Sequence, residues 1–365
     1  MTLAIRGIGA VGGFGCGIDA LDTALAGNER KVQRVSVKTP EGIIEMPAYR
    51  ADTSRLEDYV TKRVLRRVDH YSRMALLGAY LALDDAKKLD EDRSRMGIVI
   101  ATGYGASHTT FAFLDSFIHD GDNLSSPTHF SNSVHNAAVA NVSMLLNITG
   151  PGLTVSQFEM SVPSAMLAAR IWLEEGRVDS VLFGAVDEYC DVLGYCWSRF
   201  FGDSATAAHR IRPLEFGLQT AIPGEGAAFF LLTREGDYPP EYAFIKDIHF
   251  GRIEPVPPAT PKTADAILFL GADGHKGFGD HYGQYLSKAA GVACYTPLYG
   301  SLPIGTAFDI AVASLSIKNK KVFLNNETPS TGNAYYGQPL DDSQITCVKI
   351  SNSGDLGLIG LSGRQ

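Results

Sequence analysis

The chain has 365 residues, of which 45% are hydrophobic and 20% are charged, so it can bury a large core in one or two domains. Its net charge of −8 argues against nucleic acid as a partner, and no apolar run is long enough to predict a membrane span. The five cysteines show no paired spacing and the N-terminus lacks the features of a signal peptide, so a cytoplasmic location is expected.

The beginning of the chain is predicted to be a strand, a glycine-rich turn and a helix. The strand covers Leu3–Ile8 and the helix lies around Asp19–Ala26. The glycines between them superficially look like a nucleotide loop. No Lys-Ser or Lys-Thr pair follows, however, so the segment is not predicted to bind phosphate.

Further along the chain, predicted helices and strands alternate. The helices are Leu65–Lys88, Val134–Leu146, Ser161–Glu175 and Pro303–Lys318, and the strands are Gly97–Ala101, Leu153–Ser156, Ser180–Phe183, Ala227–Leu232, Ala266–Leu270 and Thr346–Lys349. This alternation predicts an α/β architecture with buried sheets. A connector at Gly236–Pro240 predicts a division into residues 1–236 and residues 237–365.

The most informative motif lies at the end of one predicted strand. Residues 150–161 read GPGLTVSQFEMS. The run resembles the nucleophile turn of the β-ketoacyl synthases, in which a strand reading TVSTAC ends in a cysteine that opens a buried helix. The match holds through residues 154–156, but Glu159 stands where the family has its cysteine.

The resemblance extends over nearly the whole chain. The segments that match the family's motifs, in the family's order, are 67–76 (RVDHYSRMAL), 82–86 (ALDDA), 96–105 (MGIVIATGYG), 174–188 (EEGRVDSVLFGAVDE) and 222–228 (IPGEGAA). The β-ketoacyl synthases have the thiolase fold. The resemblance therefore implies an α/β protein with two related βαβ halves in five layers, α-β-α-β-α.

The family's chemistry needs a cysteine and two histidines. A thiolate at a helix N-terminus accepts an acyl group from a carrier thioester. The histidines help to decarboxylate the malonyl partner and to stabilise the oxyanion. By the resemblance, Glu159 stands in the cysteine position, and Asp273 and Thr306 stand in the two histidine positions. A shifted alignment would bring His275 into the first of these, and Ser301 falls near the family's lysine.

One segment narrows the resemblance within the family. Residues 133–137 read SVHNA, which looks like the synthases of aryl-polyene and related bacterial type II systems. In those systems an active synthase pairs with a degenerate homologue, the chain-length factor, which typically lacks the cysteine. The candidate pocket residues that follow from this resemblance are His135 and Asn136, with Phe111, Phe113, Phe117 and Phe130 as a wall limiting the acyl chain. The simpler interpretations are an ordinary loop histidine and core aromatics.

The resemblance therefore predicts a chain-length-factor-like subunit that is catalytically silent alone. Its partners would be an active β-ketoacyl synthase, in a heterodimer, and an acyl carrier protein; a homodimer in isolation stays open. The dimer is expected to form through the strand Leu153–Ser156 and the helix Val134–Leu146. An acidic carrier would need a basic patch, for which the candidates are Lys62, Arg63, Arg66 and Arg67.

Two alternatives remain at this point. One is a thioester-binding enzyme with changed chemistry, such as an acyltransferase or a malonyl-decarboxylase-like enzyme, although the charge of Glu159 would repel a malonyl carboxylate. The other is a condensing enzyme that uses Cys190 or Cys196, both predicted to lie away from the nucleophile turn. No cofactor is expected. The residues His275, Asp280 and His281 match no strong zinc spacing, so no metal is expected and a solvated loop is predicted there.

Overall fold

The computed structural model describes residues 1–27, 31–121, 124–236, 241–253, 266–277, 279–286, 289–324, 339–340 and 344–363. Residues 237–240, which form most of the predicted connector, lie outside the described residues. No helix within the described ranges is both long enough and apolar enough to cross a membrane.

The first half of the chain builds a mixed sheet from five strands. They are β1 (Leu3–Gly12), β5 (Met96–Thr102), β6 (Gly152–Ser156), β7 (Ser180–Asp187) and β8 (Gly226–Arg234). Their order in the sheet is β1-β8-β7-β5-β6. β5 is parallel to both of its neighbours and is buried along its whole length, as expected for a parallel strand that is covered on both faces.

The second half repeats this strand order. Its strands are β9 (Phe244–Arg252), β10 (Ile267–Leu270), β11 (Gly291–Ala293), β12 (Ile345–Ile350) and β13 (Asp355–Ser362), arranged as β9-β13-β12-β10-β11. In each half the first strand lies beside the fifth, followed by the fourth, the second and the third. β1 and β9 pair antiparallel, and with the short β2 (Gly15–Cys16) they complete an 11-stranded sheet.

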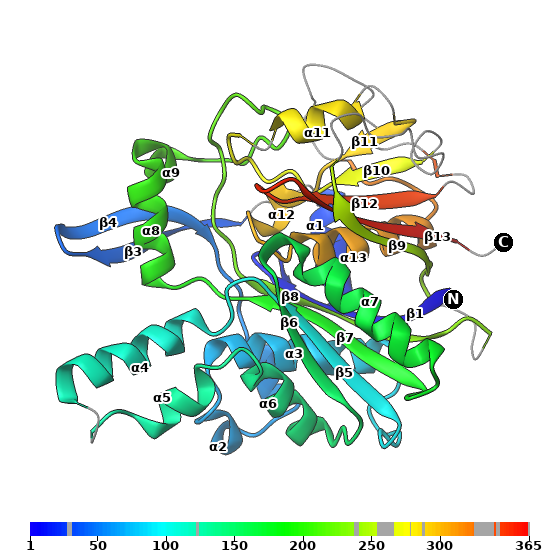
Figure 1. Cartoon of the computed structure of the whole chain (residues 1–365), viewed down its shortest axis with the longest axis horizontal. Helices are drawn as coiled ribbons and strands as arrows, with labels where there is room; N and C mark the ends of the chain where they lie inside the picture. Colours follow the sequence, from blue (N-terminus) through cyan, green and yellow to red (C-terminus); the bar gives the residue numbers. More distant parts are fainter. Residues whose placement is uncertain are drawn as a thin grey trace.

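Helices cover both faces of each half of the sheet, which gives the expected five layers (Figure 1). α3 (His70–Asp85) and α6 (Ala137–Leu146) pack on the outer face of the first half. α7 (Ser161–Glu174) and α13 (Gly305–Lys318) share the central core with the inner faces of both halves. α11 (Gly279–Leu286) covers the outer face of the second half. α13 is buried on all sides over most of its length, as a central helix must be.

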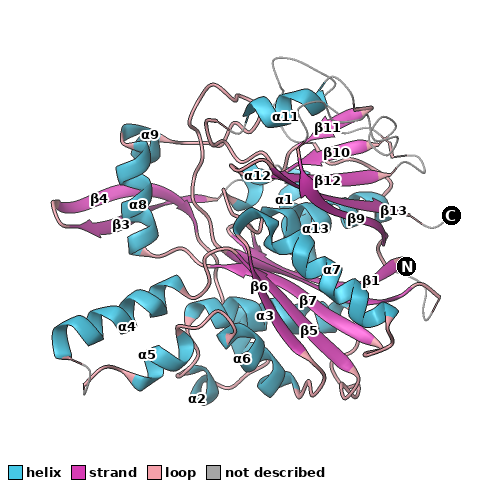
Figure 2. Cartoon of the chain, viewed as in Figure 1, coloured by secondary structure: helices cyan, strands magenta, loops and turns pink. Residues whose placement is uncertain are grey.

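Two groups of elements project from this body (Figure 2). One is the hairpin of β3 (Val32–Thr39) and β4 (Gly42–Tyr49), against which α8 (Asp191–Phe201) and α9 (Asp203–Ala207) pack. The other is the pair α4 (Ser107–Asp120) and α5 (Pro127–Asn132). The remaining short elements are α1 (Ile18–Gly27), η1 (Ser54–Asp58), α2 (Lys62–Leu65), η2 (Phe158–Met160) and α12 (Thr296–Tyr299).

The predicted single helix over Leu65–Lys88 is wrong. The chain forms the short α2, turns, and then begins α3 at His70. Asp69 is the reason, because its carboxylate accepts a hydrogen bond from the Ser72 N–H at 2.8 Å and so caps the N-terminus of α3. The predicted helix Val134–Leu146 also begins later, at Ala137.

Candidate functional site

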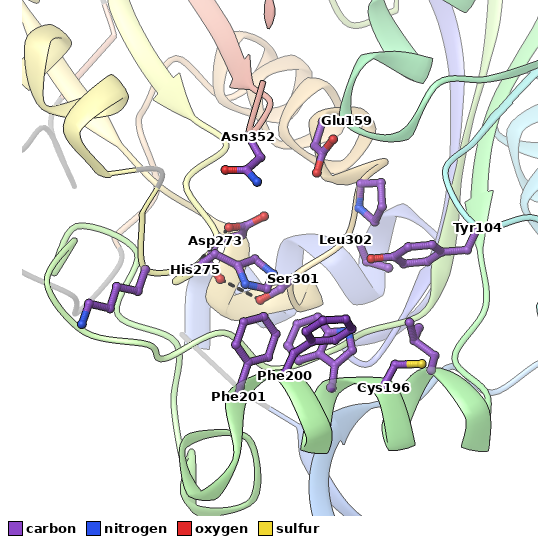
Figure 3. A pocket seen from close by; sticks show the side chains of 14 residues that line it. Tyr104, Glu159, Cys196, Phe200, Phe201, Asp273, His275, Ser301, Leu302 and Asn352 are labelled. Atoms are coloured by element: carbon purple, nitrogen blue, oxygen red, sulfur yellow. Dashed lines mark hydrogen bonds between the residues drawn. The ribbon is translucent and has the colours of Figure 1, made fainter. Parts of the chain in front are cut away.

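Loops from both halves of the sheet enclose a pocket of about 380 Å³. These loops follow β5, β6, β10 and β11 and join β12 to β13, so the pocket lies at the carboxyl ends of strands, where open α/β sheets typically bind ligands. α8 closes the opposite side (Figure 3). The lining residues are Tyr104, Glu159, Leu193, Cys196, Trp197, Phe200, Phe201, Asp273, His275, Lys276, Ser301, Leu302, Pro303 and Asn352.

Glu159 enters the pocket from a sharp turn between β6 and α7. The backbone reverses at Phe158, which has φ of 44°, a left-handed conformation that is costly for a residue with a side chain. Ser161 holds the turn, because its hydroxyl accepts from the Gln157 N–H at 2.7 Å and donates to the Thr102 carbonyl at 2.8 Å. Glu159 is half-buried and its carboxylate points into the cavity (Figure 3).

Asp273 and Lys349 form a buried ion pair at another wall of the pocket. The Lys349 ammonium lies 3.0 Å from the Asp273 carboxylate and donates to the Gly271 carbonyl at 3.0 Å. Burial alone would raise the pKa of Asp273, but the charge of Lys349 holds this pKa below its ordinary value. Asp273 is therefore ionised and already paired. Lys349, on β12, was not among the residues predicted from the sequence.

His275 lies in the same pocket, so the prediction of a solvated loop at this residue is wrong. Its ring lies 4.9 Å from Trp197 and 5.2 Å from Phe201, between ring centroids, and its Nδ1 lies 3.2 Å from the Gln219 amide nitrogen. Burial lowers the pKa of His275, which leaves the imidazole neutral near pH 7. No three His, Cys, Asp or Glu side chains gather as metal ligands within the described ranges.

Thr306 is buried and does not line the pocket. It is the second residue of α13, and its hydroxyl has no hydrogen-bond partner among the described residues. Ser301 does line the pocket; its hydroxyl donates to the Asp273 carbonyl at 2.7 Å and accepts from the Ile222 N–H at 3.1 Å. Glu159 and Asp273 thus line the same pocket, and Thr306 is not among the residues that line it.

The end of β7 fixes the loop that carries Tyr104. The Asp187 carboxylate accepts from the Thr102 hydroxyl at 2.8 Å, the Gly103 N–H at 2.9 Å and the Tyr104 N–H at 2.8 Å. Burial nevertheless raises the pKa of Asp187 to about 6. This loop also meets the second half of the chain, because a Cβ at Gly103 would lie 2.4 Å from Pro303.

The other predicted pocket residues lie outside this cavity. Phe111 lines a separate pocket of about 390 Å³ beside α4, and Phe113 and Phe130 contact each other between α4 and α5 with ring centroids 5.3 Å apart. His135 packs against Gly105, and Asn136 is the residue preceding α6. The structure therefore places these side chains on or near the projecting helices α4 and α5.

The two cysteines weighed as alternative nucleophiles differ in position. Cys190 is buried beside the second pocket, and burial raises the pKa of its thiol. Cys196, on α8, lines the same pocket as Glu159, so the prediction that it lies away from the nucleophile turn is wrong. The sequence places it 37 residues further along, and only the packing of α8 over the pocket brings the two together.

Comparison with known proteins identifies the family. The sequence model described as "Beta-ketoacyl synthase, N-terminal domain" matches residues 4–237. The chain belongs to the β-ketoacyl synthase family. The 3-oxoacyl-[acyl-carrier-protein] synthase 2 of Staphylococcus aureus (strain N315) is 25% identical over 183 residues, which cover 48% of this chain and 44% of that protein. The chain thus matches less than half the length of this relative.

Solved ketosynthases share the fold over the entire chain. "The ishigamide ketosynthase/chain length factor" superposes with a TM-score of 0.79 at 15% identity, covering 100% of this chain and 99% of that one. A type II polyketide ketosynthase, in complex with its acyl carrier protein, gives 0.71 at 16% identity, with coverage of 100% and 99%. In this β-ketoacyl synthase homologue the turn after β6 brings the Glu159 side chain to the pocket.

Proposed function

We propose that the chain is a chain-length-factor-like subunit of a carrier-protein-dependent fatty acid or polyketide elongation system, catalytically degenerate and partnered with an active synthase. One observation carries the proposal. The turn after β6 retains a strained left-handed residue and opens a buried helix, yet the side chain it delivers to the pocket is that of Glu159.

The site chemistry supports a silent subunit. A carboxylate is a poor nucleophile toward a thioester, and its acyl product would be an unstable anhydride. The first histidine position holds Asp273, whose carboxylate forms an ion pair with Lys349. The second holds Thr306, which does not line the cavity. With this alignment neither position holds a histidine, which supports a chain that does not decarboxylate malonyl groups or stabilise an oxyanion in the family's way.

The remaining parts of the proposal concern partners and location. The exposed edge strand β6 would pair with the partner synthase, and the exposed Lys62, Arg63, Arg66 and Arg67 would meet an acidic carrier protein in the cytoplasm. Phe111, Phe113 and Phe130, with His135 and Asn136, would contribute to a wall that limits the acyl chain in the heterodimer. We retain residues 1–236 and 237–365 as the two halves.

Intact-mass measurement after incubation with an acyl-carrier thioester tests the silent state. The protein alone is expected to gain no acyl mass. The Glu159→Cys variant is expected to become acylated but to condense little, because Asp273 and Thr306 still stand in the two histidine positions. Condensation by the unmodified chain alone would contradict the proposal, as would failure to form a complex with an intact synthase encoded beside it.

A second candidate function is a thioester-binding enzyme with changed chemistry, of acyltransferase or malonyl-decarboxylase type. The observation that favours it is the pocket itself, which stays open and combines the neutral His275 with the thiol of Cys196. A stable acyl adduct on Cys196, lost in Cys196→Ser, would support this candidate. Release of carbon dioxide from a malonyl thioester would do the same.

A further inference from the structure

The pocket contains one carboxylate whose charge is not balanced by a neighbour. Among the described residues Glu159 has no hydrogen-bond or ion-pair partner, although its carboxylate points into the cavity (Figure 3). The other lining carboxylate, Asp273, is paired with Lys349 at 3.0 Å. His275 is a neutral imidazole near pH 7, and Lys276 is exposed. Glu159 is therefore the lining carboxylate that can act as counter-ion to a ligand, and the lining also includes the exposed Lys276.

Aromatic side chains line the same cavity as this carboxylate. Trp197, Phe200 and Phe201 line the cavity from α8, and Phe200 and Phe201 lie opposite Glu159 in Figure 3. Tyr104 adds a further ring beside Glu159. A carboxylate combined with several aromatic rings is a favourable environment for an organic cation, because the ring faces carry negative electrostatic potential and the carboxylate supplies a counter-ion. The same arrangement disfavours a ligand that carries its own carboxylate.

We propose that this pocket binds a small organic ammonium ligand, with Glu159 as its counter-ion and the aromatic residues of α8 covering its apolar part. The inference rests on the proposed function, since it assigns a ligand class to the site left without its catalytic cysteine. The volume of about 380 Å³ is in the range of small-molecule sites. The charge of Glu159 disfavours a malonyl group, whose carboxylate it would repel.

Three probes of similar size and different charge test the proposal on the full chain by isothermal titration calorimetry. They are phenethylammonium, 2-phenylethanol and 3-phenylpropanoate. The ammonium is expected to bind about tenfold more tightly than the alcohol, and the carboxylate more weakly than either. Glu159→Gln should remove the preference for the ammonium and leave the affinity for the alcohol unchanged. Phe200→Ala should weaken the binding of the ammonium and of the alcohol to the same extent.

Glu174→Gln is the matched control, because Glu174 is an exposed carboxylate at the far end of α7, the helix that follows Glu159. It should bind all three probes as the unmodified chain does. Equal affinity for ammonium and carboxylate, no binding of any probe, or an unchanged preference in a folded Glu159→Gln variant would each overturn the proposal. The result does not depend on complex formation, so a chain that binds the ammonium but no synthase would refute only the partner role.

Discussion

Lys349 supplies the positive charge that neutralises the Asp273 carboxylate in the wall of the pocket. It is almost fully buried, and both of its polar contacts, the Asp273 carboxylate and the Gly271 carbonyl, lie 3.0 Å away. Behind it Asp309 is also buried, and burial raises the pKa of Asp309 to about 7. Removal of Lys349 would leave Asp273 as an unpaired charge in the interior, which is far costlier than the pair itself is stabilising.

We therefore expect Lys349→Met to lower the free energy of unfolding by roughly 3–5 kcal/mol. The double variant Lys349→Met with Asp273→Asn should recover most of this loss, because no buried charge then remains unpaired. Urea unfolding followed by circular dichroism measures both. Lys62→Met, at an exposed lysine on α2, should change stability by less than about 0.5 kcal/mol. A double variant as unstable as the single one would show that the pair is not the cause.

Glu188 gives the folded protein a pH dependence of the opposite sign to that of Asp273. Its side chain is 1% exposed and accepts from the His108 N–H at 2.7 Å at the start of α4. Burial raises the pKa of Glu188 to about 8, from an ordinary value of 4.5. Between these values the folded state keeps a proton that the unfolded chain has lost, so stability falls as the pH rises through this window.

Glu188→Gln should remove this contribution while its amide oxygen still accepts from His108. As the pH rises from 5 to 8, the unmodified chain should lose unfolding free energy relative to the variant. The slope of this loss should reach up to about 1.4 kcal/mol per pH unit. Glu91→Gln, at an exposed carboxylate, should show no such trend. Parallel curves for Glu188→Gln and the unmodified chain would contradict the assignment.

At the scale of elements, the pocket depends on a tight contact between loops of the two halves. A Cβ at Gly103 would lie 2.4 Å from the Pro303 Cβ, closer than side-chain carbons approach, and Asp187 fixes the Gly103 backbone by hydrogen bonds. Gly103→Ala should therefore destabilise the chain by roughly 1–3 kcal/mol, measured by urea unfolding. Gly217→Ala is the control, because a Cβ at Gly217 has nothing within 4 Å. Equal stability of the two variants would mean that the loops separate without cost.

The sequence predicted those elements whose hydrophobic runs are continuous, such as β5, β7, β8 and α13. It could not predict β3, which is largely exposed, or β9, whose second half faces solvent, because neither has a buried run. The resemblance to the family's motifs placed Glu159 and Asp273 at the site, since both residues follow the ends of predicted strands. Lys349 lies 76 residues from Asp273 and Cys196 lies on a separate helix, so only tertiary packing brings them there.

At the scale of the whole molecule, the repeated strand order leaves β6 at one end of the sheet and β11 at the other. β6 pairs only with β5 among the described strands, and exposed apolar side chains lie on either side of it in sequence: Met144 on α6 is 68% exposed and Phe158 is 60% exposed. A free edge strand beside apolar surface favours association, because it leaves backbone groups and apolar area unpaired.

We accordingly expect a dimer built through β6 and α6. An obligate interface of this kind buries more than about 2,000 Å² in total, so a single buried charge should weaken it strongly. Met144→Asp should shift the sedimentation profile at micromolar concentration toward monomer, both for the chain alone and for its complex with an intact synthase. Ile43→Asp is the matched control, because Ile43 is 69% exposed on the β3–β4 hairpin, away from β6.

The same complex tests the proposed wall. Phe113 and Phe130 contact each other between α4 and α5, and Phe111 lies on the same helix as Phe113. Within the heterodimer, substitution of any of these three by alanine should lengthen the product without abolishing turnover, because the active cysteine would belong to the partner. Mass spectrometry of the released chains measures the length. If none of the three substitutions changes the product length, these residues do not limit the acyl chain. If the chain stays monomeric in the presence of an intact synthase, the proposed partner role is wrong as well.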